Sequence, residues 1–313
     1  MEPEEDHSIV GEHSTMGKCS SDSARHRGKR RNGNECFGCC GERKDPKLFT
    51  ENDMKWYLNW LFIRGVNLVY PHAFYYSIRD DRGDERPPEV GLNNPFWPQY
   101  SKMSKYIKRM CFLNTDAVNQ ADVAIICDED TLSWKMAKPL FTHQIEFNYL
   151  EKELISDCRI ISGKRDKEKI SLKIASQSYF VIVVSGELYE AIEGKEKEII
   201  DEFASNGGRL LIVDEDTFSE EAFLSEMSDA IDSKIGFNGD TFYLRTSHLI
   251  KDDTEYILLS NEKEEAISFA MNVSEYDIVK VVDPYTEKEI SFADGVIKLE
   301  PYELIVAFIK RKL

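Results

Sequence analysis

The sequence has no long hydrophobic run and no recognisable leader. Its longest apolar runs, at residues 179–184 and 304–309, hold about six residues each, whereas a transmembrane helix needs roughly 20. The opening residues Met-Glu-Pro-Glu-Glu-Asp are acidic and no apolar segment follows them, so no secretory signal is readable. Neither the G-x-G-x-x-G pattern nor the P-loop of nucleotide-binding proteins is present. We therefore expect a cytoplasmic protein that uses no cofactor and has no membrane partner.

Basic residues are scarce relative to acidic ones. There are 40 Lys and Arg against 57 Asp and Glu, which gives a net charge of −17 over 313 residues. Residues 1–50 hold nine of each kind, so the whole excess lies on residues 51–313. An acidic body repels polyanions, and we expect no nucleic-acid partner for it. The chain has seven cysteines, and Cys111, Cys127 and Cys158 stand singly within apolar patterns, which fits a reducing compartment.

The N-terminal third is predicted to hold a tail and then mainly helical structure. Residues 1–33 are polar and lack a hydrophobic period, which predicts a disordered tail. Thr50 and Asp53 resemble a capping box, and Gly65 is a typical residue just after a helix end. The pattern that follows the tail predicts, in order, a helix over residues 51–64, a strand over 66–70, a long loop over 75–98 and a helix over 99–113.

The rest of the chain predicts an α/β part and an all-β part. Strands and helices alternate over residues 118–235, which is typical of a small parallel sheet flanked by helices. The strands expected there lie at 123–127, 158–161, 179–184 and 209–213, and the helices at 135–155 and 187–205. After Gly236 the helical period disappears, and seven short strands separated by turn residues predict an antiparallel β-sandwich over residues 236–313.

Two polar residues stand where a barrel places its catalytic groups. Glu35 begins a loop, a helix and the predicted strand over 66–70 follow, and His72 comes directly after that strand. In a (β/α)8 barrel the loops after the strands form the catalytic face, so Glu35 and His72 are expected on the same side of adjacent strands. A carboxylate and an imidazole make chemical sense in that position.

The motifs around these residues resemble a known group of enzymes. The chain reads E-x-F-G from Glu35, R-G-V-N-L-V-Y-P-H-A-F from Arg64, R-P-P-E-V-G-L-N-N-P-F-W from Arg86 and A-D-V-A-I-I-C-D-E-D from Ala121. Over roughly residues 35–313 it resembles the C-terminal part of clan-A-type glycoside hydrolases, near the family 42 β-galactosidases and the family 106 α-L-rhamnosidases.

The resemblance implies a three-part fold, an activity and a site. The parts are the end of a (β/α)8 barrel over residues 34–117, a flavodoxin-like or amidotransferase-like α/β domain over 118–235, and the sandwich over 236–313. In such enzymes the middle domain can serve in trimerisation, so a homo-oligomer is implied. The substrate implied is a glycoside. Glu35 would end barrel strand 7 as a catalytic carboxylate, the nucleophile of a retaining mechanism, and the sugar site would be lined by His72, Phe74 and Trp97.

The chain departs from that pattern in ways that predict an incomplete enzyme. Glycoside hydrolysis needs two carboxyl groups that flank the scissile bond, and the partner acid would lie upstream, where only the polar tail stands. A full barrel takes about 250 residues, and roughly 80 are available here. The polar residues before Glu35 do not resemble a buried strand, and Cys39-Cys40 stand where relatives carry an aromatic residue. We therefore predict a truncated hydrolase that is inactive alone.

Other classes of function remain as alternatives. The first is a non-catalytic module that associates through its α/β domain. The second is a zinc or nucleic-acid module on the tail, since Cys36, Cys39 and Cys40 could bind zinc together with Cys19 or His26, although the second C-x-x-C of common zinc sites is missing. The basic residues of the tail are Arg25, Arg27, Lys29, Arg30 and Arg31. An amidotransferase is not expected, because no Cys stands between glycines in a nucleophile elbow.

Overall fold

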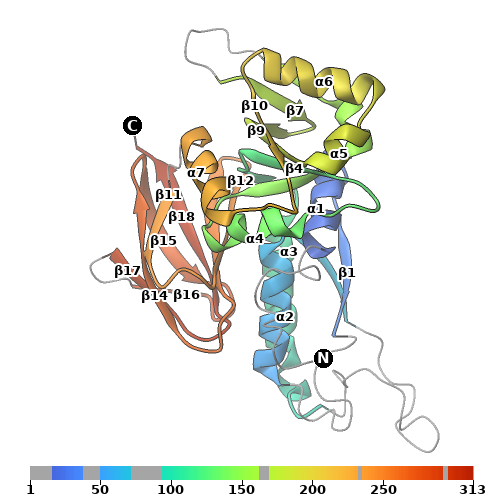
Figure 1. Ribbon diagram of the computed structural model, residues 1–313. Coiled ribbons are helices and arrows are strands. Elements are labelled where there is room, and N and C mark those ends of the chain that lie inside the picture. The colour runs from blue at the N-terminus through green and yellow to red at the C-terminus, as the bar shows by residue number, and fades with distance from the viewer. Residues whose placement is uncertain are drawn as a thin grey trace, which may run out of the picture.

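A computed structural model describes residues 16–37, 50–71, 94–161, 169–231, 235–291 and 295–312 of the chain. These residues form a mixed α/β structure with five β-sheets, of two, three, three, four and six strands (Figure 1). Within the described residues, no helix is both long and apolar enough to cross a membrane.

The first part of the chain is a strand–helix–strand–helix unit preceded by a further helix. Strands β1 and β2 pair in parallel, and Glu35 lies opposite Tyr70 in their register. Thr50 and Asp53 form the predicted capping box at the start of α2. Gly65 follows the helix at φ +90° with the Arg25 and Ser21 side chains against it, so a side chain there would clash. The elements are α1 (Met16–His26), β1 (Gly33–Cys36), α2 (Glu51–Ile63), β2 (Leu68–Pro71) and α3 (Tyr100–Asn114).

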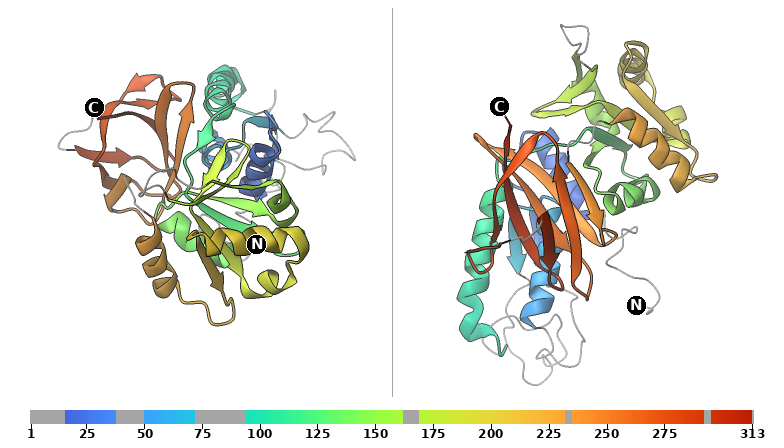
Figure 2. Two further views of the ribbon diagram at one scale, coloured as in Figure 1. Left: turned by 90° about the horizontal axis from the view of Figure 1, so that it is seen from above. Right: turned by 90° about the vertical axis from the view of Figure 1, so that its left-hand side faces the viewer.

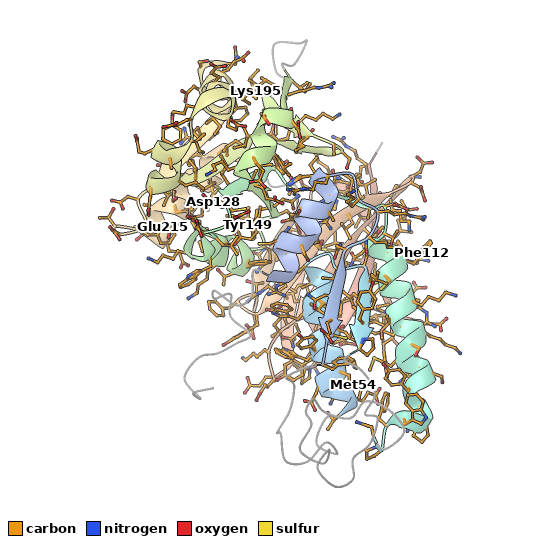
Figure 3. All side chains as sticks on the ribbon, turned by 90° about the vertical axis from the view of Figure 1, so that its right-hand side faces the viewer. Met54, Phe112, Asp128, Tyr149, Lys195 and Glu215 are labelled. Atoms are coloured by element: carbon orange, nitrogen blue, oxygen red, sulfur yellow. The ribbon has the colours of Figure 1, made fainter. Side chains whose placement is uncertain are left out.

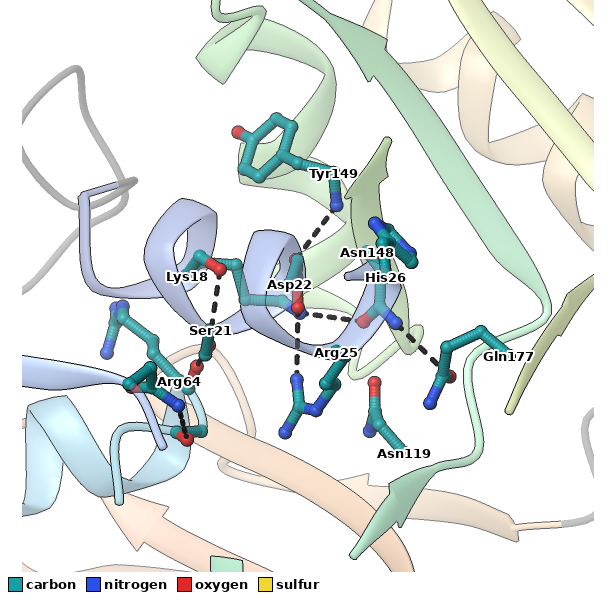
Figure 4. A network of polar contacts seen from close by, with 12 residues as sticks. Lys18, Ser21, Asp22, Arg25, His26, Arg64, Asn119, Asn148, Tyr149 and Gln177 are labelled. Carbon is teal, nitrogen blue, oxygen red and sulfur yellow. Dashed lines mark hydrogen bonds and ion pairs between the residues drawn. The ribbon is translucent and has the colours of Figure 1, made fainter. Parts of the chain in front are cut away.

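Residues 1–33 are predicted to be a disordered tail, but residues 16–33, which the structure describes, are ordered. Residues 16–26 form helix α1, which packs against the parallel sheet. Its buried face is polar: Lys18 is 6% exposed, Asp22 is fully buried and His26 is 5% exposed (Figure 4). A search for hydrophobic periodicity misses such a helix, because its stability comes from paired polar groups rather than from an apolar stripe.

His26 predicts a dependence of stability on pH. Its Nε2 atom lies 2.5 Å from the Tyr179 hydroxyl, and burial lowers its pKa from 6.5 to about 4. Between these values the unfolded chain binds more protons than the folded chain, so the free energy of unfolding falls as the pH drops from 6.5 to 4. The shift corresponds to about 3 kcal/mol across this window. The free energy of unfolding is measured by urea titration at several pH values. We expect His26→Gln to lose about 3 kcal/mol less between pH 6.5 and 4 than the unaltered chain does. If the two chains show the same dependence on pH, His26 does not cause it.

The middle of the chain is built around a four-stranded sheet in which all strands are parallel. All five residues of β4 are buried, as expected for a central strand covered on both faces. Two separate apolar clusters cover the two faces. In sheet order the strands are β10 (Arg209–Val213), β9 (Val181–Ser185), β4 (Val123–Cys127) and β5 (Phe147–Glu151). The helices are α4 (Trp134–Thr142), α5 (Gly186–Ala191), α6 (Gly194–Ser205) and α7 (Glu220–Ala230).

Two of the strands predicted here are confirmed at 123–127 and 209–213, whereas the helix predicted over 135–155 is confirmed only as far as Thr142 and is wrong beyond it. Helix α4 ends at Thr142, Gln144 turns the chain at φ +54°, and the edge strand β5 follows. The strand predicted over 158–161 exists but lies outside the parallel sheet. It forms β6 (Arg159–Ile161) of an antiparallel sheet with β7 (Ser171–Ile174) and β8 (Gln177–Tyr179), beside the short helix η5 (Lys152–Asp157).

The C-terminal part consists of two antiparallel sheets that share one apolar cluster, so they face each other (Figure 2). The outer face of the six-stranded sheet packs on α2 and α3. The short strands predicted over residues 236–313 include 267–273 and 296–299, and the structure has strands at these residues. The three-stranded sheet runs β11 (Ile235–Gly239), β14 (Ile267–Val273), β17 (Val296–Leu299). The six-stranded sheet runs β16 (Lys288–Glu289), β15 (Tyr276–Asp283), β18 (Leu304–Arg311), β13 (Thr254–Asn261), β12 (Leu244–Lys251), β3 (Val118–Asn119).

Candidate functional site

Strand β1, which carries Glu35, forms although its sequence is polar. Two asparagines tie the segments that precede β1 and β2 together: the Asn32 backbone N–H donates to the Asn67 side chain at 3.0 Å, and the Asn67 amide donates to the Arg30 carbonyl at 3.0 Å. The Asn32 amide also donates to the Gly65 carbonyl. The residues before Glu35 are not a buried apolar strand, as predicted, yet they form a strand, because side-chain hydrogen bonds rather than apolar burial hold it.

Glu35 lies near the carboxyl end of the strand pair, where a parallel α/β unit presents its functional groups. Its side chain is exposed, whereas Cys36 and Phe37, the next two residues, are fully buried. Phe37 adopts φ +72° and packs against Tyr57, with ring centroids 5.8 Å apart. A bulky residue at positive φ is a strained conformation that tends to occur at functional sites. The backbone after Glu35 is thus anchored by a buried aromatic side chain.

An aromatic pair lies at the same end of the sheet. Trp97, in the short helix η4 (Trp97–Gln99), stacks on Tyr100 with ring centroids 5.3 Å apart and an interplanar angle of 24°. Burial raises the pKa of Tyr100 to about 12, with a smaller contribution from the nearby Cys36. Tyr100 packs in the same apolar cluster as Cys36, the residue that directly follows Glu35.

The structure brings only part of the predicted site together. Of the predicted site residues, Glu35 lies in β1 and Trp97 in η4, linked through Tyr100 and the nearby Cys36, whereas His72 and Phe74 lie outside the described residues. Strands β1 and β2 carry a single carboxylate, Glu35, whereas glycoside hydrolysis needs two. Sequence reasoning did not single out Tyr70, which is opposite Glu35 and 54% exposed. A short apolar strand gives no sign of which residues face outward.

The basic residues of the N-terminal segment are engaged within the molecule. Arg25 pairs with Asp22 at 3.0 Å and Arg27 pairs with Glu151. Arg30 Nε lies 2.9 Å from an Asp116 carboxylate oxygen, and the Arg31 guanidinium donates to the Thr115 hydroxyl at 2.6 Å. Four of the five basic residues thus have intramolecular partners, which disfavours a nucleic-acid role for them.

The zinc alternative receives no support from the residues that can be placed. Cys19 packs in the apolar cluster on one face of the parallel sheet, whereas Cys36 is buried in the cluster around α2 and α3. His26 contacts Tyr179, and Cys39 and Cys40 lie outside the described residues. Among the residues that the structure describes, no group of three or more His, Cys, Asp or Glu side chains could hold a metal ion.

The carboxyl ends of the four-stranded parallel sheet, a common ligand edge in α/β proteins, are occupied by internal contacts. Asp128 follows β4 and pairs with Lys152 at 3.2 Å. Glu215 follows β10 and accepts a hydrogen bond from Ser133. Figure 3 shows Asp128 and Glu215 close to Tyr149 at this side of the sheet. Asp128 and Glu215 at this edge are thus engaged in internal contacts.

The fold resembles solved structures of glycoside hydrolases. A β-galactosidase from Bacillus circulans sp. alkalophilus matches all of this chain and 59% of its own, with a TM-score of 0.64 and 10% identity. A GH42 β-galactosidase from G. stearothermophilus matches 99% of this chain and 58% of its own, with a TM-score of 0.62 and 14% identity. A rhamnosidase from Novosphingobium sp. PP1Y matches 96% of this chain and 33% of its own, with a TM-score of 0.62 and 13% identity.

These likenesses define the class of fold. The chain has a glycoside hydrolase-like fold, as its motifs predicted. It spans from one third to about three fifths of the length of these solved structures. No protein-family model matches the sequence, and no curated protein matches it.

Proposed function

We propose that this chain is the C-terminal part of a carbohydrate-degrading glycoside hydrolase and that Glu35 is its catalytic carboxylate. The observation that carries the proposal is the parallel register of β1 and β2 across helix α2, which holds Glu35 near the carboxyl end of a strand. The fold likeness to β-galactosidases and a rhamnosidase supports a glycoside as the substrate class. In this proposal the unit from β1 to α3 is the end of a barrel, the parallel sheet belongs to a flavodoxin-like domain, and the two C-terminal sheets form a β-sandwich.

Glu35 acts as the nucleophile in this proposal, and His72, Phe74 and Trp97 line the sugar site. A retaining mechanism places a second, protonated carboxyl group about 5–5.5 Å from the nucleophile. Strands β1 and β2 do not supply that group, so further barrel strands have to provide it. Parallel strands are stable when both faces and both edges are covered, and a two-stranded parallel sheet therefore also favours completion by additional strands.

Glu35→Gln tests the proposed nucleophile. We expect the purified chain alone to release no nitrophenol from aryl galactosides, rhamnosides, glucosides or arabinosides. A longer polypeptide or assembly that adds the preceding barrel strands should turn over at least one of them, and Glu35→Gln should lower that rate by at least about 10³-fold, because an amide cannot form the glycosyl ester. Glu153→Gln, an exposed position away from the site, is the matched control.

Two results would count against the proposal in different ways. Full activity of Glu35→Gln in the longer form would remove Glu35 from catalysis. Turnover by the chain alone that disappears in Glu35→Gln would keep Glu35 in its role but show that copies of this chain complete the site.

The alternative function, a non-catalytic module that self-associates through the α/β part, has one observation in its favour. Strand β10 is at the edge of the parallel sheet, and its Ile212 side chain is 49% exposed. An exposed apolar residue on an edge strand favours pairing with another copy. The molar mass in solution, measured by light scattering, distinguishes a monomer from such an assembly.

A further inference from the structure

A cavity of about 820 Å³ lies where the parallel sheet, helix α7 and the C-terminal sheets meet, and we call it the interlayer cavity. It is bounded by the residues that precede β4, β5 and β9, by α7, and by one face of strands β11, β12 and β13. It therefore lies at the amino ends of the parallel strands, opposite the edge that Asp128 and Glu215 occupy. Its volume is within the range of roughly 300–1,000 Å³ that is typical of small-molecule sites.

One wall of the interlayer cavity carries a hydrogen-bonded group of polar side chains. His248 Nε2 on β12 lies 2.7 Å from a carboxylate oxygen of Glu255 on β13. The Tyr276 ring meets the His248 ring edge-on, with centroids 6.2 Å apart, and its hydroxyl group hydrogen-bonds Glu255. All three side chains line the cavity. His248 and Glu255 lie on the neighbouring strands β12 and β13, and Tyr276 reaches them from β15, beyond β18, in the same sheet. Held by one another, the three side chains can both donate hydrogen bonds to a ligand and accept them.

Glu146, which precedes β5, adds a second carboxylate to the lining. Glu146 accepts hydrogen bonds from the Asn119 amide at 2.9 Å, the Thr246 hydroxyl at 3.1 Å and the His248 backbone N–H at 3.0 Å. These donors fix its orientation and occupy three of the roughly four acceptor positions of a carboxylate. One acceptor position is therefore left for a ligand in the cavity.

The rest of the lining indicates which ligand would fit. Apolar side chains from all three layers, including Phe180, Met227 and Phe237, form much of the surface. The ionisable side chains nearly balance: three carboxylates, one lysine, one arginine and two histidines line the cavity, and the arginine, Arg311, pairs with Glu275 at 3.1 Å. A strongly charged ligand would find no excess of opposite charge. Hydroxyl groups, which donate and accept, suit the mixed polar groups, and a carbon face suits the apolar wall.

We propose that the interlayer cavity binds a neutral polyhydroxylated small molecule of monosaccharide to disaccharide size. Its hydroxyl groups donate to Glu255 and Glu146 and accept from His248, while its carbon skeleton packs against Phe237. The site is distinct from that of the proposed function, because none of its lining residues belongs to β1, β2 or α3.

The test measures binding rather than turnover. Methyl galactopyranoside, methyl rhamnopyranoside and methyl glucopyranoside are titrated into the chain at millimolar concentration and followed by ligand-observed NMR and calorimetry, with hexylamine and cyclohexanol as cationic and apolar probes. Ser228→Trp fills the cavity from α7, where Ser228 is exposed. Ser225→Trp, on the same helix but outside the cavity lining, is its matched control. Glu255→Gln removes the charged acceptor, and Glu35→Gln separates this site from the proposed catalytic one.

We expect at least one glycoside to bind, with no binding by Ser228→Trp and an affinity lowered about tenfold by Glu255→Gln, since a hydrogen bond to a charged group is lost. Ser225→Trp and Glu35→Gln should bind as the unaltered chain does, and circular dichroism should show that all variants are folded. The proposal is overturned if no glycoside binds, if Ser228→Trp binds normally, or if hexylamine or cyclohexanol binds more tightly than every glycoside. None of these binding results tests whether Glu35 takes part in glycoside hydrolysis, so either proposal can fail while the other holds.

Discussion

Replacing Glu262 with Gln is expected to lower the free energy of unfolding by about 3–5 kcal/mol, because it leaves two buried guanidinium groups without their counter-charge. Glu262 is 2% exposed and follows β13. One carboxylate oxygen lies 2.7 Å from Arg64 Nη1, at the end of α2, and the other lies 3.0 Å from Arg245 Nε on β12. The contact with Arg245 is close enough for an ion pair but is not aligned as a hydrogen bond.

This triad joins the unit from β1 to α3 to the C-terminal sheets, so its loss should weaken the contact between them. Arg64 also lies over the Trp60 ring, 4.2 Å from its centroid, and keeps that contact in the variant. Urea unfolding followed by tryptophan fluorescence gives the change in free energy. Glu265→Gln is the control: Glu265 pairs with Lys263 at 2.9 Å on the surface, 74% exposed, and little measurable effect is expected. Equal stability of the two variants would contradict a structural role for the buried triad.

Asp22→Ala is expected to have an effect of similar size, about 3–5 kcal/mol, since it leaves the buried Lys18 ammonium unpaired. The Asp22 carboxylate is fully buried and lies 2.8 Å from Lys18 Nζ and 3.0 Å from Arg25 Nη1. It also accepts a hydrogen bond from the Tyr149 backbone N–H at 2.8 Å, on the edge strand β5 (Figure 4). Lys18 reaches the same strand through the Asn148 side chain at 2.9 Å. Through Tyr149 and Asn148, Asp22 and Lys18 fasten α1 to the parallel sheet.

The matched control for Asp22→Ala is Asp201→Ala. Asp201 pairs with Lys197 at the same i, i+4 spacing that joins Lys18 to Asp22, but on the solvent side of helix α6. Its removal should change the unfolding midpoint very little, because an exposed pair adds little stability. Limited proteolysis adds a local readout: the bonds near Arg25 and Lys29 should become sensitive in Asp22→Ala at urea concentrations that leave the control intact. If α1 stays protected in Asp22→Ala, the buried pair does not hold this helix.

Several local features were predictable from the sequence, and their causes are local. The capping box at Thr50 and Asp53 satisfies backbone groups three residues apart, and the structure confirms it. The run from Val123 to Cys127 is apolar at every position, as a strand covered on both faces requires, and it forms β4 at those residues. The placement of Glu35 near a strand end also followed from the order of segments and the family resemblance. That Glu35 is catalytic stays a prediction.

The errors occur where the partner of a residue is far away in the sequence. Strand β5 lies inside the stretch predicted as a helix, and it is a strand because it pairs with β4, about 24 residues earlier in the register. Disorder is predicted for residues 1–33 because they are polar and lack a hydrophobic period, but Lys18 and Asp22 of helix α1 are buried. Their partners, Asn148 and Tyr149, come more than 100 residues later.

By itself the sequence determined the composition, the acidic body, the capping box before α2, the apolar strands β4 and β10 and the likeness of the fold to glycoside hydrolases, since each depends on neighbouring residues, on their period or on short motifs. The tertiary structure alone decided that a polar helix is buried, that the asparagine pair Asn32 and Asn67 closes the ends of β1 and β2, and that His248 and Glu146 face one cavity. The physical reason is that hydrogen bonds and ion pairs stabilise a buried polar group only when a specific distant partner arrives, and no local pattern records that partner.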